Sequence, residues 1–141
     1  MDLNNIIKIL PNIYLGNNCE IDTEFIKNNL IKTIILINDA NNISKFNDLC
    51  NLININFDTN SNYINFNYTN NLIFDQVTHM QNILIISNKN LLGFIIVSAF
   101  MINYLNVSFF KILILDKAYN IGLVNTNLYK LLYDYYCIAI K

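Results

Sequence analysis

The stretch ILIISNKNLLGFIIVSAFMI, residues 83–102, decides the fold. It begins with four apolar residues typical of a buried strand, continues through the short segment SNKNLL (residues 87–92), and ends in an apolar run of helical length. A strand, a tight loop and a helix in this order is the layout of a loop that binds phosphate. The segment SNKNLL, however, contains no glycine, arginine or cysteine. The stretch therefore indicates a known layout without the residues that hold and attack a phosphate.

On both sides of this stretch, apolar runs alternate with helical patterns. Continuous or alternating apolar runs predict strands at residues 5–10, 12–18, 32–38, 52–57 and 83–86. Helical spacing predicts helices at residues 22–30, 71–82, 92–105, 108–117 and 125–140. Strands that alternate with helices, followed by a run of helices, predict one α/β domain over residues 1–141, with a small, mostly parallel central sheet flanked by helices.

Local signals refine these boundaries. Ser108 and either Asn125 or Thr126 are expected to cap the last two helices. Residues 58–70 are predicted as a polar connection. The helix after it is supported by the spacing of four apolar residues, Leu72, Ile73, Val77 and Met80.

The composition excludes several classes of function. The chain is 54% hydrophobic and 13% charged, with a formal net charge of −1. This balance indicates neither a nucleic-acid surface nor a polybasic membrane patch. The apolar run at 91–102 is shorter than the about 20 residues that a membrane span needs, so a buried core helix is expected. The widely spaced Cys19, Cys50 and Cys137 favour buried or free thiols in a reducing compartment over a disulfide framework.

Two residue types are absent or rare. All 9 basic residues are lysines, so the chain has no arginine, and His79 is its 1 histidine. A mechanism that needs a guanidinium group or a pair of histidines is therefore excluded.

Five segments, taken in order, resemble the small dual-specificity protein phosphatases, and the compact poxviral members most closely. LPNIYLGNN (10–18) is similar to their opening, and IKTIILIN (31–38) to their buried strand after the first helix. LININFDTNSNYINF (52–66) resembles the strand that leads into the general-acid loop. The segment 83–101 falls on the signature strand, loop and helix, and GLVNTNLYKLLYDYY (122–136) resembles the closing helix. The resemblance implies a dual-specificity-phosphatase-like α/β sandwich.

The departures from this family fall on the residues of its chemistry. The family signature is H-C-x-x-G-x-x-R-S, and here Ile86 stands at the histidine, Ser87 at the cysteine and Asn90 at the glycine. Leu92 or Gly93 stands at the arginine, depending on whether the loop has lost a residue. Without a thiolate nucleophile and an arginine that grips the phosphate, we expect no useful turnover. The degenerate loop comprises Ile86, Ser87, Asn88, Lys89, Asn90, Leu91, Leu92 and Gly93.

Four polar residues are candidate remnants of a site. Ser87 is a residual nucleophile or, as we favour, a polar residue at a strand end with no base nearby in the sequence. Lys89 either holds an anion in the loop or is a solvated loop residue. Asp58 occupies the vestigial general-acid position of the resemblance, or else caps a turn. His79 has no partner for a metal or base role and is expected on a helix surface or at a helix boundary.

The aromatic residues of the last two helices point to a contact surface instead. Tyrosines are common at interfaces because the ring buries apolar area while the hydroxyl stays hydrogen-bonded. One stripe of the last helix must face the core, which leaves a second stripe for a partner unless these helices are more covered than their place at the end of the chain suggests. The interface candidates are Phe109, Phe110, Tyr129, Tyr133 and Tyr136.

These observations predict a catalytically inactive dual-specificity phosphatase homologue, a pseudophosphatase, that acts as a protein-interaction or structural module. The expected partner is another protein or a second copy of the chain, inside a cell or a virus particle. No cofactor, metal, nucleic acid or membrane is expected to bind. Two alternatives remain: a phospho-ligand-binding module that keeps weak anion binding at the loop, and a residual phosphatase.

Overall fold

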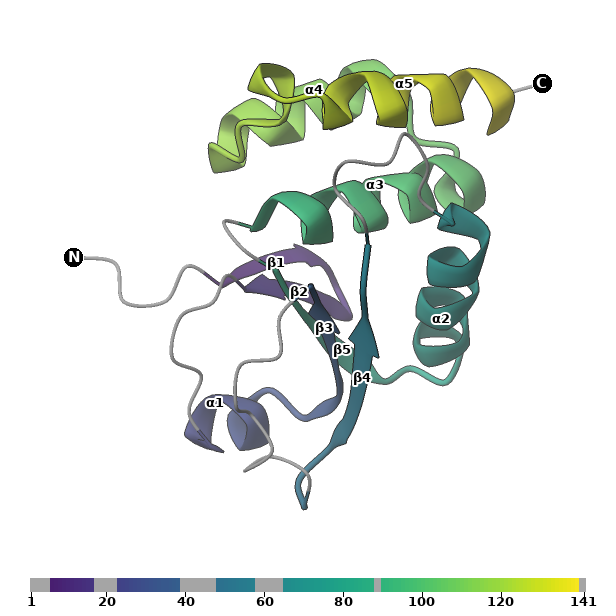
Figure 1. Cartoon of the computed structure of the whole chain (residues 1–141). Coiled ribbons are helices and arrows are strands. Elements are labelled where there is room, and N and C mark those ends of the chain that lie inside the picture. The colour runs from purple at the N-terminus through teal and green to yellow at the C-terminus, as the bar shows by residue number, and fades with distance from the viewer. Residues whose placement is uncertain (1–5, 17–22, 39–47, 58–64, 88–89, 140–141) are drawn as a thin grey trace.

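A five-stranded sheet lies at the centre of the computed structural model, which describes residues 6–16, 23–38, 48–57, 65–87 and 90–139 (Figure 1). Its strands lie in the order β1-β2-β5-β3-β4. β1 is antiparallel to β2, and the other neighbouring pairs are parallel, so the predicted mostly parallel sheet is confirmed. The strands are β1 (Ile7–Leu10), β2 (Ile13–Gly16), β3 (Ile31–Ile37), β4 (Asn51–Ile55) and β5 (Asn82–Ile86).

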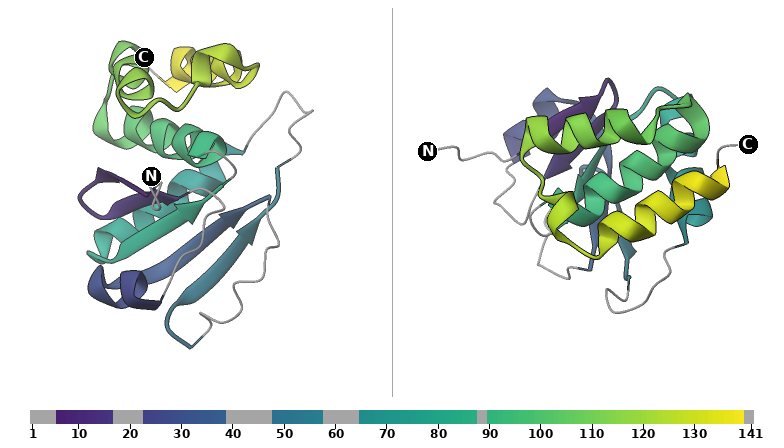
Figure 2. Two further views of the ribbon diagram at one scale, coloured as in Figure 1. Left: turned by 90° about the vertical axis from the view of Figure 1, so that its left-hand side faces the viewer. Right: turned by 90° about the horizontal axis from the view of Figure 1, so that it is seen from above.

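The helices form layers on both faces of the sheet. They are α1 (Thr23–Asn28), α2 (Phe66–Thr78), α3 (Leu91–Leu105), α4 (Phe109–Tyr119) and α5 (Leu128–Ala139), with a 3-10 helix, η3 (Leu123–Asn125), before α5. Figures 1 and 2 show α1 on one face of the sheet and α2 and α3 on the other. The last two helices, α4 and α5, form a further layer over α3.

Alternation along the strands explains why both faces are covered. Successive side chains of a strand point to opposite faces. Leu15, Ile35 and Ile85 belong to the large core shared with α2, α3 and the last two helices. Their neighbours Ile34 and Leu84 belong to a smaller core with α1. Because both faces are buried, these strands appear in the sequence as continuous apolar runs.

Helix α3 is the central helix of the structure. Every residue from Leu92 to Ile102 is buried, so the expectation of a core helix is confirmed. Among the described residues, no helix combines the length and the apolar character needed to cross a membrane.

The predicted caps of the last two helices are observed in the structure. Ser108 Oγ accepts the Lys111 N–H at 3.2 Å at the start of α4, and Thr126 Oγ1 accepts the Leu128 N–H at 3.2 Å at the start of α5. η3 was not predicted. Within η3, the side chain of Leu123 is buried.

The start of α2 corrects the sequence prediction. Residues 66–70 were expected in a polar connection, but they form the first turns of the helix. Asn65 Oδ1 accepts the Tyr68 N–H at 3.1 Å, which caps the helix, and Phe66 is buried. Met80 was expected among the apolar positions of this helix, but it lies beyond the helix end with a φ of 56° and is 85% exposed.

Candidate functional site at the carboxyl edge of the sheet

The carboxyl ends of the parallel strands meet at one edge of the sheet. Gly16 of β2 and Leu36 of β3 both pair with Ile86 of β5, and Ile37 of β3 pairs with Ile55 of β4. In open α/β sheets, ligands bind outside the carboxyl ends of the strands, because loops and helix N-termini converge there. This edge is therefore the candidate site, and Ser87 is the first residue beyond β5.

Ser87 is fully buried and holds the end of β5 to the start of α3. Its N–H donates to the carbonyl of Gly16 at 3.0 Å, and its carbonyl accepts the Asn90 N–H at 3.4 Å. Its Oγ accepts the N–H of Gly93 in the first turn of α3 at 2.9 Å. The first N–H groups of a helix have no partner within the helix, so Ser87 satisfies one of them from outside. The Ser87 side chain, a candidate nucleophile in the sequence, thus fixes the backbone.

Gly93 allows α3 to approach the sheet closely. A Cβ atom at this position would lie 3.1 Å from Ser87 Oγ, and 3.3 Å from both Ile85 Cγ2 and Leu15 Cδ2. These distances are shorter than ordinary carbon contacts, which lie at about 3.5–4.0 Å. Before it, Asn90 adopts a left-handed backbone conformation with a φ of 62°, which asparagine tolerates better than most residues.

Asn38 connects the other two strands at this edge, and sequence reasoning missed it. It follows β3 with a φ of 53°. Its N–H donates to the carbonyl of Ile55 at 2.8 Å, its Nδ2 donates to the carbonyl of Phe57 at 2.7 Å, and its Oδ1 accepts the Phe57 N–H. An asparagine directly after a buried strand was the available signal. Asn38 therefore fixes the chain at the point where it enters the segment with Asp58.

Three residues of the predicted loop and acid positions lie outside the described residues: Asp58, Asn88 and Lys89. The other members of residues 86–93 belong to regular elements or flank them. Ile86 ends β5, and Leu91, Leu92 and Gly93 form the first turn of α3.

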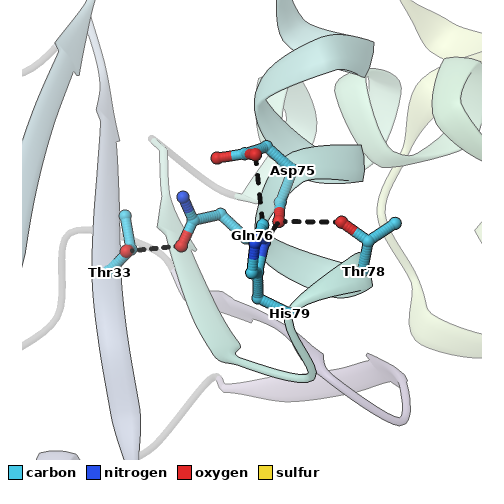
Figure 3. Close-up of polar contacts among 5 residues, drawn as sticks. All are labelled: Thr33, Asp75, Gln76, Thr78 and His79. Carbon is cyan, nitrogen blue, oxygen red and sulfur yellow. Dashed lines mark hydrogen bonds and ion pairs between the residues drawn. The ribbon is translucent and has the colours of Figure 1, made fainter.

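His79 lies at the opposite edge of the sheet. It follows α2, before β5 begins, and β5 spans five residues, or about 16 Å at about 3.3 Å per residue. Its Nδ1 lies 2.7 Å from the Asp75 carbonyl oxygen, and Figure 3 shows the ring beside that residue. The neighbouring Gln76 points the other way, to β3, where its Oε1 accepts the Thr33 hydroxyl at 2.9 Å. The prediction of a helix-boundary histidine is confirmed, and His79 is too far from Ser87 to act on it.

The aromatic interface candidates divide into covered and exposed residues. Phe109 is 6% exposed, so it offers little surface to a partner. It lies against a cluster of tyrosines of α5, with ring centroids 5.1–5.7 Å away: Tyr129, Tyr133 and Tyr136. Part of the tyrosine stripe that we expected to be free therefore packs against α4. Phe110, the next residue, is 71% exposed.

Tyr133 and Tyr135 differ in environment. Tyr133 is 45% exposed, and a hydrogen bond with Cys137 raises its pKa. Burial raises the pKa of Tyr135, whose hydroxyl accepts the Asn70 Nδ2–H at 3.0 Å. Asn70 was predicted to lie in a polar connection, so this contact between α2 and α5 was not foreseen.

Solved structures with the same fold include phosphatase-like and phosphatase-domain proteins. The human tyrosine phosphatase-like serine/threonine/tyrosine-interacting protein matches with a TM-score of 0.73 and 18% identity, over 96% of this chain and 98% of that one. DUSP15 matches with a TM-score of 0.71 and 18% identity, over 93% and 86% of the two chains. A leucine-rich-repeat and phosphatase-domain protein from Entamoeba histolytica matches with a TM-score of 0.65 and 21% identity, over 82% and 79%.

Sequence comparison gives no such match. No protein-family model matches the chain, and no curated protein matches it. At identities this low, the structural likeness establishes the fold alone. The chain thus has the α/β fold of the dual-specificity phosphatases, as its sequence predicted.

Proposed function

We propose that this chain is a pseudophosphatase: it has the phosphatase fold, does not hydrolyse phosphoesters, and acts by binding another protein. The observation that carries the proposal is the state of Ser87, whose buried Oγ accepts the Gly93 N–H at 2.9 Å. A serine in this state is a poor nucleophile for two reasons. First, burial away from water disfavours the charged alkoxide form of Ser87. Second, His79 is the single histidine of the sequence and lies at the other edge of the sheet, so it cannot act as the base.

The same contact argues against the alternative of a retained phosphate site. Backbone N–H groups at the start of a helix bind anions when they are free to do so. Here the Gly93 N–H is already bonded to Ser87. The arginine that would grip a phosphate on two oxygens is absent from the whole sequence. We therefore prefer protein binding to phospho-ligand binding.

A protein of this fold that is named for interaction supports the second half of the proposal. One of the similar structures is called tyrosine phosphatase-like and an interacting protein. In the present chain, Phe110, Ile114 and Tyr133 are exposed on the outer helices, where they are available to a partner. We place this activity inside a cell or a virus particle, because the spacing of the cysteines does not suggest a disulfide framework.

Turnover of p-nitrophenyl phosphate by the purified chain tests the proposal. We expect the rate to equal that of buffer for the wild type, for Ser87→Ala and for Ser87→Cys, because a thiol alone does not supply the missing arginine. An active dual-specificity phosphatase serves as the assay control. Turnover by the wild type that Ser87→Ala removes would refute the proposal, and turnover that Ser87→Ala leaves unchanged would identify a contaminating enzyme.

A further inference from the structure

The two faces of α4 differ sharply in what they contact. Phe109, Ile112 and Asp116 are buried, and they recur at the helical spacing of three and four residues. The opposite face is exposed to solvent in the outermost layer (Figure 2). We call it the outer α4 face, and it consists of Phe110, Lys111, Ile114, Lys117 and Ala118.

The apolar part of the outer α4 face is unusually open for side chains of this size. Phe110 is 71% exposed and Ile114 is 46% exposed. They lie four residues apart, so they are neighbours on the helix surface. Covering a phenylalanine and an isoleucine removes apolar area from water, which favours association. This pair forms the apolar anchor of the face.

The charged residues of the outer α4 face are both positive. Lys111 follows Phe110 directly, and Lys117 lies three residues after Ile114. The carboxylate of α4, Asp116, is buried, and its Oδ1 accepts the Leu123 N–H at 2.8 Å. The outer α4 face therefore presents two lysines beside an apolar pair, and α4 exposes no carboxylate on this face.

This charge pattern selects the class of partner. A second copy of the chain, docked through the same face, would bring lysines against lysines, which costs free energy. A partner with aspartate or glutamate beside its apolar residues would pair with both lysines. Membrane binding through an amphipathic helix relies on a large apolar face in addition to basic residues. The outer α4 face has two large exposed apolar side chains, Phe110 and Ile114.

We propose that the outer α4 face binds an acidic amphipathic helix of another protein, which rests on the proposed function of this chain as a binding module. α4 has 11 residues, or about 16 Å at about 1.5 Å per residue, which matches about three turns of a partner helix. Apolar side chains of the partner pack around Phe110 and Ile114. Its flanking carboxylates pair with Lys111 and Lys117.

Fluorescence anisotropy with synthetic helices tests this inference on the full chain. The probe is a labelled peptide with leucines at helical spacing and glutamates beside them, and a second peptide carries lysines in place of the glutamates. We expect the glutamate peptide to bind about ten-fold more tightly than the lysine peptide or better, and less tightly as salt rises. Phe110→Asp should abolish binding, and Lys111→Glu/Lys117→Glu should reverse the preference between the peptides.

Matched variants separate the outer α4 face from general charge effects. Lys27→Glu/Lys32→Glu makes the same change of net charge at exposed residues of α1 and β3, and it should leave both affinities unchanged. The inference is overturned if neither peptide binds, if both bind equally, or if the α4 variants bind like the wild type. It is also overturned by self-association that Phe110→Asp abolishes, or by binding to phosphatidylserine vesicles in place of the peptide. The phosphatase assay is independent of these outcomes, so the failure of one proposal is distinguishable from the failure of the other.

Discussion

Ser87 shows how one buried hydroxyl serves as a structural link. Its N–H, carbonyl and Oγ all take part in hydrogen bonds, to Gly16, Asn90 and Gly93. Together these bonds hold β2, β5 and the start of α3 in one arrangement. The sequence identified Ser87 as a polar residue at a strand end, which is correct. The partner of the hydroxyl was not predictable, because it depends on how closely α3 approaches the sheet at Gly93.

Replacing this hydroxyl should destabilise the fold. In Ser87→Ala the buried Gly93 N–H loses its acceptor, which should cost about 1–3 kcal/mol of the free energy of unfolding. Urea denaturation followed by circular dichroism measures this change. Ser98 is the matched control, because it is equally buried in α3 but its Oγ has no hydrogen-bond partner among the described residues. Ser98→Ala should be neutral or stabilising, and an equal loss in both variants would contradict the role given to Ser87.

At the scale of the element, α4 explains why two adjacent phenylalanines have different roles. The helix is apolar nearly all round in sequence, so periodicity alone does not say which face is buried. The structure places Phe109 among three tyrosines of α5 and leaves Phe110 in solvent. Neighbours that are distant in sequence determine which face of α4 is buried, and a local sequence pattern contains no information about them.

The two phenylalanines therefore form a test pair. Phe109→Ala should lower the free energy of unfolding by about 3–5 kcal/mol, because it removes the ring at the centre of the aromatic cluster. Phe110→Ala, at an exposed position of the same helix, should change it by no more than about 0.5 kcal/mol. Thermal and urea unfolding of both variants measure the difference. Similar losses in both variants would contradict the orientation of α4, in which Phe109 is buried and Phe110 is exposed.

At the scale of the whole molecule, stability should fall at alkaline pH. Burial raises the pKa values of Cys50 and Tyr135, so the fold favours their protonated forms. The unfolded chain releases these protons at lower pH than the folded chain does, near about 8.5 for cysteine and about 10 for tyrosine. The stabilisation is therefore complete below these values and is lost as pH rises through the folded-state pKa values.

Urea unfolding between neutral pH and pH about 11 checks this expectation. Tyr135→Phe and Cys50→Ala should each flatten the decline of stability with pH. The slopes are compared, because Tyr135→Phe also removes the hydrogen bond with Asn70 at every pH. A slope that neither variant alters would assign the alkaline loss to other groups.

The order of the elements was largely predictable, since strands buried on both faces leave continuous apolar runs such as Ile31–Ile37. The parts that were missed have polar sequences. The first turns of α2 contain Thr69 and Asn70, which are nevertheless buried and hydrogen-bonded to Phe66 and Tyr135. At the site, the absence of cysteine from residues 86–93 and of arginine from the chain was visible in the sequence. The contact between Ser87 and Gly93 was not, because it depends on the packing of α3.

The central place of β5 has a consequence for how the chain folds. β5 lies between β2 and β3, and Ile13 pairs with Ile83, so the middle of the sheet is completed by a strand made after both of its neighbours. Pairings across such sequence separations form slowly. During synthesis on the ribosome, β2 and β3 have no β5 between them until residue 86 has emerged, and their apolar edges remain open to chaperones and to aggregation in that interval.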